Sequence, residues 1–258
     1  SVRAMSPKWS PDGKWISFIA QEGQREELYL IQPTGEGLHQ LTNAGQDIFQ
    51  YEWSPSGNQI LAVENKGGSF ELILLETESS TKSALRSEAG IHSNPNWAKD
   101  ESYITFEFEG PTLPPEIYRM DLKSKQVTQL TFSTLPAIQK NNFVTPEIVS
   151  YKSYDGLDIP AFLYRPEKSN GAAILYPHGG PKDQYGFGWD DIAQYFIAKG
   201  YTYLAPNYRG STGYGKDFER ANYNDWGVGD TQDCLRGAKY LHTLKDIKPD
   251  RIAITGGS

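Results

Sequence analysis

The composition of this 258-residue chain is that of an ordinary globular protein, with 38% apolar and 22% charged residues. Its net charge of −7 disfavours nucleic acids and anionic membranes as partners, because both bind basic surfaces. The sequence shows no transmembrane segment, no apolar leader and a single cysteine, Cys234. It therefore predicts no intrachain disulfide and no metal cluster, and we expect a cytoplasmic protein without metal or cofactor.

The first half of the chain repeats every 44 residues. A tryptophan followed by a turn sequence occurs at Trp9 and Trp53 and, in degraded form, at Trp97. Two strand-like segments follow each tryptophan, at 15–20 and 28–31 in the first copy. A period in the low forties with several short strands is typical of β-propeller blades. We expect each tryptophan to pack between neighbouring blades.

Residues 1–133 are therefore predicted to form three propeller blades, and their pattern resembles TolB-like repeats. A three-repeat β-meander or sandwich is the alternative. Propellers close with about four to eight blades, so we expect further blades that either precede residue 1 or come from another chain. The first copy looks like an internal repeat, which places these blades before it. Residues 134–146 are polar and contain prolines, which predicts a linker.

Residues 147–258 have a different pattern. Two strand segments, 147–152 and 158–164, are joined through an Asp-Gly turn that signals a hairpin. Buried strands then alternate with helices, which predicts a largely parallel sheet covered on both faces. The predicted strands are 172–176, 201–205 and 251–255, and the predicted helices are 190–199 and 231–244. Helical spacing places Ile192, Cys234 and Leu235 on the buried faces.

The last strand runs into Gly-Gly-Ser, ending at Ser258. A strand followed by glycines and a serine matches the first part of the nucleophile elbow of an α/β-hydrolase. In that elbow a tight turn lifts the serine hydroxyl out of the sheet, which requires glycines. An ordinary Gly-Gly-Ser loop is the alternative. The strand and helix order of residues 147–258 favours the elbow.

A His-Gly-Gly-Pro sequence at 178–181 directly follows the strand 172–176. Hydrolases place there the loop whose backbone N–H faces the oxyanion. Proline has no N–H, so the donor must be Gly179 or Gly180, and Gly180 is favoured. His178 is not expected to be the catalytic base, because this fold has the chain order Ser, Asp or Glu, then His. We expect it to form local hydrogen bonds and to shape the rim of the substrate site.

A loop rich in Gly and Tyr at 207–215 follows another buried strand. It lacks the Gly-Lys-Ser/Thr of a phosphate loop, and no helix is expected to begin after it. Its place at the carboxyl edge of the sheet predicts that Tyr208 and Tyr214 border the substrate site. The remaining histidines, His39, His92 and His242, are expected to be incidental polar residues.

Together, the 178–181 motif, the 207–215 loop and the terminal Gly-Gly-Ser resemble the prolyl oligopeptidase family of serine peptidases. The similarity is greatest to acylaminoacyl and dipeptidyl peptidases, and Asp225-Trp226-Gly227 also resembles that branch. The resemblance implies β-propeller blades followed by the N-terminal part of an α/β-hydrolase domain. It implies Ser258 as nucleophile, and as substrates short peptides cut near a free or acylated N-terminus.

The acid and histidine of that family have no counterpart in these 258 residues, so we expect the chain alone to be inactive. We also expect it to fold poorly alone, because the last strand would form an exposed apolar edge. Two other functions are compatible with the sequence. An esterase of small acyl groups would use the same machinery. A non-catalytic propeller binding module would use the first half alone.

Overall fold

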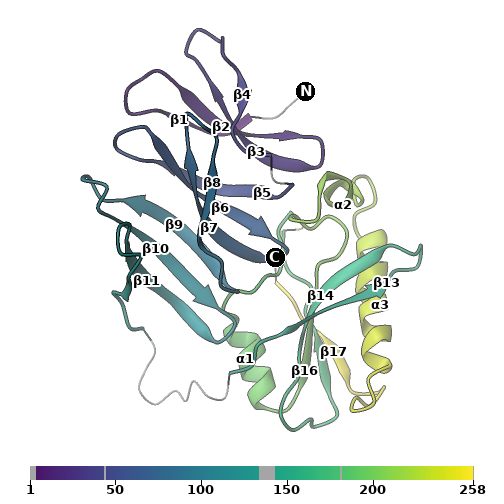
Figure 1. Ribbon diagram of the computed structural model, residues 1–258. Coiled ribbons are helices and arrows are strands. Elements are labelled where there is room, and N and C mark those ends of the chain that lie inside the picture. The colour runs from purple at the N-terminus through teal and green to yellow at the C-terminus, as the bar shows by residue number, and fades with distance from the viewer. Residues whose placement is uncertain (1–3, 44, 134–142, 181, 258) are drawn as a thin grey trace. The chain divides into compact units, whose positions relative to one another are not determined.

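The computed structural model describes residues 4–43, 45–133, 143–180 and 182–257 of the chain. It divides into two compact units (Figure 1). Unit 1 comprises 1–110 and 115–134, and unit 2 comprises 111–114 and 135–258. Most of the predicted linker, 134–142, lies outside the described residues, and 143–146 contain no regular element.

Unit 1 consists of propeller blades, as predicted. In each described blade, four strands pair in chain order, and one parallel bridge, Phe70 to Ile91, joins the second blade to the third (Figure 1). The first blade contains β1 (Ala4–Trp9), β2 (Ile16–Glu22), β3 (Arg25–Ile31) and β4 (His39–Gln40). The second contains β5 (Asp47–Trp53), β6 (Gln59–Lys66), β7 (Ser69–Glu76) and β8 (Lys82–Arg86). The third contains β9 (Ile91–Trp97), β10 (Tyr103–Gly110), β11 (Leu113–Asp121) and β12 (Val127–Gln129).

The middle blade is covered on both faces, which explains its long apolar runs. Ile60 and Ala62 of β6 belong to the core shared with the first blade. Leu61 and Val63, which point to the opposite face, belong to the core shared with the third blade. His92 of β9 is also fully buried there, with Nδ1 2.7 Å from Phe70 O, so the expectation that it is incidental is wrong.

The repeated turns have a left-handed residue at the same position in all three copies. Gly13 and Gly57 have φ of +71° and +77°. In the degraded third copy Glu101 takes their place with φ of +57°. A non-glycine residue in this region is disfavoured by contacts of its Cβ, so the third turn keeps its shape at an energetic cost.

Two of the three repeated tryptophans contact the preceding blade, as predicted. Trp53 donates from Nε1 to Ser17 Oγ at 2.8 Å, and Trp97 donates to Glu52 O at 3.2 Å. Trp9 differs, because 60% of its surface is exposed. The described residues contain no blade before β1, so Trp9 does not test the prediction.

Unit 2 is a five-stranded mixed sheet in the order β13-β14-β16-β15-β17. The hairpin pairs antiparallel with β16, whereas β16, β15 and β17 are parallel. This is the N-terminal part of an α/β-hydrolase, as predicted. The strands are β13 (Glu147–Lys152), β14 (Asp158–Tyr164), β15 (Ala173–Leu175), β16 (Thr202–Pro206) and β17 (Ile252–Ile254), and the helices are α1 (Asp191–Ala198), α2 (Lys216–Arg220) and α3 (Gly229–His242).

Helices α1 and α3 cover opposite faces of this sheet. Ala193 and Ile197 of α1 pack on one set of strand residues, and Leu241 of α3 packs on the alternate set. The Asp190 side chain caps α1 by accepting from Ala193 N at 2.8 Å. Parallel strands with both faces covered are apolar throughout, which agrees with the fully buried β16.

Several predictions for the helices are wrong. Ile192 and Leu235 are 44% and 50% exposed. Polar residues are buried instead: Gln194 binds both backbone groups of Val144, and Asp233 is fully buried. Apolar periodicity misses such residues because their burial depends on distant partners. Cys234 is only half-buried. Helix α2 follows the 207–215 loop and was not predicted, because it has five residues and none of them is fully buried.

In the part of the chain that the structure describes, no helix combines the length and the apolar composition needed to cross a bilayer.

Candidate active site

The parallel pairing of β15 and β17 brings the two predicted catalytic loops together. Leu175 lies opposite Ile254, and Thr255 donates its N–H to Leu175 O at 3.1 Å. Both strands end at the same edge, so residues three positions beyond the pair, His178 and Gly257, leave the sheet side by side. Ser258, the predicted nucleophile, follows Gly257 and lies outside the described residues.

A cavity of about 490 Å³ opens at this edge of unit 2. Of the residues predicted for the site, His178, Gly179, Gly180 and Tyr208 line it, together with Gly257 of the elbow. Tyr214 does not line it. The other lining residues are Pro177, Trp226, Gly227, Asp230, Thr231, Cys234 and Ile254.

Glycines allow the backbones of the two loops to approach closely. A Cβ on Gly256 would lie 2.6 Å from Pro177 O, so a larger residue would push the elbow away from the 178–181 loop. Gly180 has φ of +126°, and a Cβ there would lie 2.8 Å from Lys182 N. Both positions therefore require glycine for local reasons.

His178 is held by its own loop and by the loop after β16. Its Nδ1 lies 2.7 Å from Gly179 O, and its Nε2 lies 2.9 Å from Ser211 Oγ. The ring stacks on Tyr208 at 4.6 Å between centroids, and Tyr208 donates its hydroxyl to His178 O at 2.6 Å. Burial lowers the pKa of His178 below its usual value, partly opposed by the Gly179 carbonyl and Asp183. Both ring nitrogens have protein partners, as expected for a residue that shapes the loop.

Asn207 connects the segment after the 178–181 loop to the loop after β16. Its Oδ1 accepts from Tyr185 N at 2.6 Å, and its Nδ2 donates to Tyr185 O at 2.9 Å. Nδ2 also donates to the hydroxyl of Tyr214 at 2.7 Å. Tyr214 therefore contacts Asn207 without lining the cavity. Because Asn207 is fully buried, loss of these bonds would leave unpaired polar groups.

An ion cluster of Arg209, Asp233 and Asp155 holds the segments next to the cavity together. Arg209 donates from its backbone N and from Nε to Asp233 Oδ2, each at 2.9 Å, and from Nη2 to Asp233 Oδ1 at 2.9 Å. A second carboxylate, Asp155 of the hairpin turn, accepts from Nη1 at 2.9 Å. The hydrogen bonds that Arg209 donates to Asp233 raise the pKa of Arg209, with a further contribution from Asp155. The cluster ties the hairpin, the loop carrying Tyr208 and helix α3 together.

Several cavity residues were not identified as site residues from the sequence. Trp226 lies in the Asp-Trp-Gly sequence, the one signal that could have indicated it, and is 62% exposed. Asp230 and Thr231 belong to the first turn of α3, where Asp230 Oδ1 accepts from Gly227 N at 2.9 Å. Burial raises the pKa of the Cys234 thiol to about 12, so this cavity residue stays protonated at neutral pH. Within the described ranges, no group of His, Cys, Asp and Glu could hold a metal ion.

Comparison with known protein families agrees with this geometry. Residues 1–153 match the TolB beta propeller domain, and residues 170–258 match the prolyl oligopeptidase family. The chain belongs to the TolB-type propellers through its first part, and its last part is similar to the prolyl oligopeptidase family. The predicted resemblance is thus confirmed, with both halves of the chain included in it.

Several similar proteins are named as peptidases. An uncharacterized peptidase of Bacillus subtilis, YuxL, is 32% identical over 164 residues, which cover 62% of this chain and 25% of that protein. Dipeptidyl-peptidase 5 of Porphyromonas gingivalis is 23% identical over 98% of the chain and 38% of its own length. A puromycin-hydrolyzing peptidase of Mycobacterium tuberculosis superimposes with a TM-score of 0.87 at 22% identity, covering 100% of this chain and 41% of that one. The chain therefore spans well under half the length of the relatives it matches.

Proposed function

We propose that the chain supplies the nucleophile and part of the oxyanion hole of a serine peptidase that cuts short peptides near their N-terminus. One observation carries the proposal. The register of β15 and β17 brings Gly257 and residues 178–180 to the lining of one cavity, and this supports the proposal. In this proposal, residues 1–133 are the last three blades of the propeller, and 147–258 are the first half of the catalytic domain.

The proposed reaction begins with attack of Ser258 Oγ on the scissile carbonyl carbon. The carbonyl oxygen becomes an oxyanion and accepts a hydrogen bond from Gly180 N–H, with Gly179 as the other candidate donor. Collapse of this intermediate breaks the C–N bond, releases the amine and leaves an acyl-enzyme on Ser258, which water then hydrolyses. Removal of one such donor typically slows the reaction by about 10²–10³-fold.

The base that takes the serine proton is not His178 in this proposal. His178 is the one histidine that lines the cavity among the described residues, but both of its ring nitrogens already have protein partners. In the α/β-hydrolase order the acid and the base follow the nucleophile. Tyr208 acts on the rim of the site and through its hydrogen bond to His178 O.

The names of the relatives support peptides as the substrate class, because they include a dipeptidyl peptidase and other peptidases. The dipeptidyl and acylaminoacyl modes are both compatible with the resemblance. An esterase of small acyl groups is the second candidate, since the cavity of about 490 Å³ would also admit a small ester. We place the protein in the cytoplasm in this proposal, and cell fractionation would test that location.

The test compares turnover of a dipeptide anilide, an N-acetylated amino-acid anilide and a short acyl ester by the protein as its source makes it. We expect the anilides to be cleaved with higher kcat/KM than the ester. Ser258→Ala should abolish all turnover, whereas Ser169→Ala, which changes an exposed serine of the same unit, should leave it unchanged. Ester turnover alone would favour the esterase. No turnover of the anilides or of the ester would favour a binding module.

A further inference from the structure

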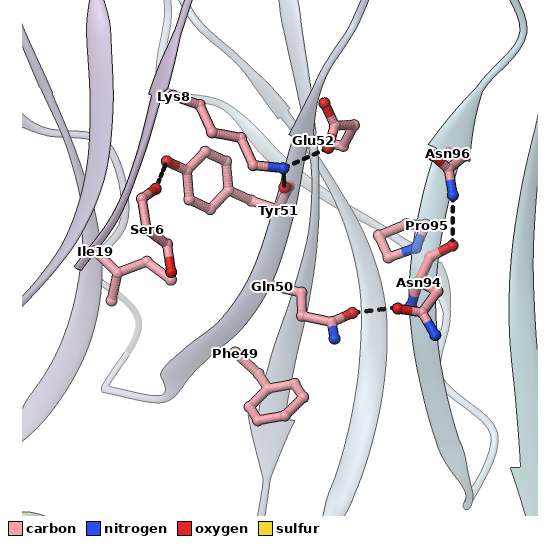
Figure 2. Close-up of a pocket in the computed structure, with 10 residues that line it drawn as sticks. All are labelled: Ser6, Lys8, Ile19, Phe49, Gln50, Tyr51, Glu52, Asn94, Pro95 and Asn96. Carbon is pink, nitrogen blue, oxygen red and sulfur yellow. Dashed lines mark hydrogen bonds and ion pairs between the residues drawn. The ribbon is translucent and has the colours of Figure 1, made fainter.

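The 44-residue repeat brings six equivalent polar residues of unit 1 into one cavity. They occupy the positions three and one residue before the repeated tryptophan in β1, β5 and β9. The cavity has a volume of about 290 Å³, and Figure 2 shows these strands contributing side chains to it. The six are Ser6 and Lys8, Gln50 and Glu52, and Asn94 and Asn96.

Each of the three strands is bulged where it reaches the cavity. In β1 the pairing with β2 shifts between Met5 and Lys8, and in β5 the pairing with β6 shifts between Ile48 and Gln50. In β9 the pairing with β10 shifts at residues 94 and 95. Bulges re-aim side chains and recur next to functional sites. Equivalent residues in β1 and β9, Ser6 and Asn94, also have left-handed φ of +52° and +49°. Such strained positions cluster at ligand contacts.

The charges in the cavity neutralise each other. Lys8 forms an ion pair with Glu52 and donates to Tyr51 O at 2.8 Å (Figure 2). The cavity therefore presents no net charge to a ligand. This favours a ligand that is recognised through uncharged groups.

The amides provide the hydrogen-bonding groups of the cavity. Gln50 Oε1 accepts from Asn94 N at 2.8 Å, which leaves its Nε2 without a partner in the described part of the chain. Asn94 is exposed, and no hydrogen bond of its side-chain amide is found among the described residues. Each primary amide offers donors and an acceptor, the same groups that a peptide main chain requires. Phe49 lies beside them with 56% of its surface exposed.

We propose that this cavity binds a short, uncharged and extended peptide segment. Strands β1 and β5 are at the edges of their sheets, and an edge strand is the usual template for an added extended chain. The amides of Gln50 and Asn94 pair with the main chain of the segment, and Phe49 contacts an apolar side chain. The volume is at the lower end of ligand sites, which are typically about 300 Å³ or more, so the segment is short. The inference does not depend on the proposed catalysis.

The test uses ¹⁵N-labelled protein with Ser258→Ala, so that cleavage cannot occur. The probe is acetyl-Ala-Ala-Phe-Ala amide, which is blocked at both ends, and the signals are the side-chain NH₂ resonances of Gln50 and Asn94. We expect millimolar peptide to shift these resonances. Gln50→Glu keeps the acceptor for Asn94 N but loses the free donor, and Asn94→Gly keeps the left-handed backbone. Together they should weaken binding by about tenfold, because each hydrogen bond contributes a few-fold.

Three controls decide the outcome. Gln126→Ala, which removes an exposed amide in a turn outside the cavity, should leave the affinity unchanged. A peptide with every amide nitrogen methylated should not bind, because it cannot donate. Thermal melting must show that the variants are folded. No shift with the probe, equal binding of the methylated peptide, or shifts produced by maltotriose and not by the peptide would overturn the proposal.

Discussion

Replacement of Asp233 by Asn tests whether the buried ion cluster holds unit 2 together. The Asp233 side chain is fully buried and accepts three hydrogen bonds from Arg209 and one from Ser153. The substitution preserves shape but removes the charge and converts one acceptor into a donor. Arg209, whose side chain is only 6% exposed, keeps Asp155 as its remaining carboxylate, and that side chain is 39% exposed.

Removal of one partner of a buried pair costs about 3–5 kcal/mol, because the other charge is left buried. Asp155 compensates in part, so we expect a loss near 3 kcal/mol in the free energy of unfolding. This corresponds to a fall of roughly 10 °C in the melting temperature of a unit of this size. Thermal unfolding followed by near-ultraviolet circular dichroism at neutral pH measures it.

The matched control is Asp158→Asn in the same hairpin. Asp158 pairs with Lys152 at 2.7 Å, but both side chains are 65% exposed, so the pair is worth about 0–1 kcal/mol. If Asp233→Asn destabilises no more than Asp158→Asn, the cluster does not anchor the site. A double variant, Arg209→Met with Asp233→Leu, should recover most of the loss, since an apolar pair leaves no buried charge unpaired.

Three further outcomes follow from the structure. Gly180→Ala should lower kcat/KM by about 10²-fold or more while the protein stays folded, because the added Cβ displaces the proposed oxyanion donor; steady-state kinetics with the anilide check this. The pKa of His178 is lowered in the folded state, so the unfolded chain takes up a proton more readily. The stability that His178 contributes is therefore present above the pKa of about 6.5 that it has in the unfolded chain, and is lost as the pH falls below that value. Urea unfolding between about pH 7.5 and 5 should show a flatter pH dependence for His178→Gln than for the wild type or for His242→Gln, an exposed control. Trp53→Ala should cost unit 1 about 3–5 kcal/mol, because Trp53 is buried against the preceding blade; no measurable loss in thermal unfolding would contradict the packing.

Local patterns were sufficient to predict most elements. The hairpin strands 147–152 and 158–164 have the predicted bounds, because alternation and an Asp-Gly turn are encoded within a few residues. The blade repeat is likewise local. The same patterns singled out residues 178–180 and 256–257, although not the register that makes them neighbours.

Long-range pairing accounts for what the sequence did not reveal. Asp233 and Arg209 are 24 residues apart, and only the folded sheet shows that they meet, so the helix periodicity wrongly placed Leu235 inside. Tyr214 was grouped with Tyr208 by composition, but its hydroxyl is bound by Asn207 away from the cavity. In each case a side chain is positioned by a partner that no local pattern specifies.

The most direct test of the central claim is the site of reaction with a fluorophosphonate. The protein as its source makes it is labelled, digested and mapped by mass spectrometry. A nucleophile at the end of the Gly-Gly-Ser elbow predicts a single adduct on the peptide that contains Ser258, and none in Ser258→Ala. An adduct on another serine, or peptide hydrolysis that persists in Ser258→Ala, would contradict the assignment.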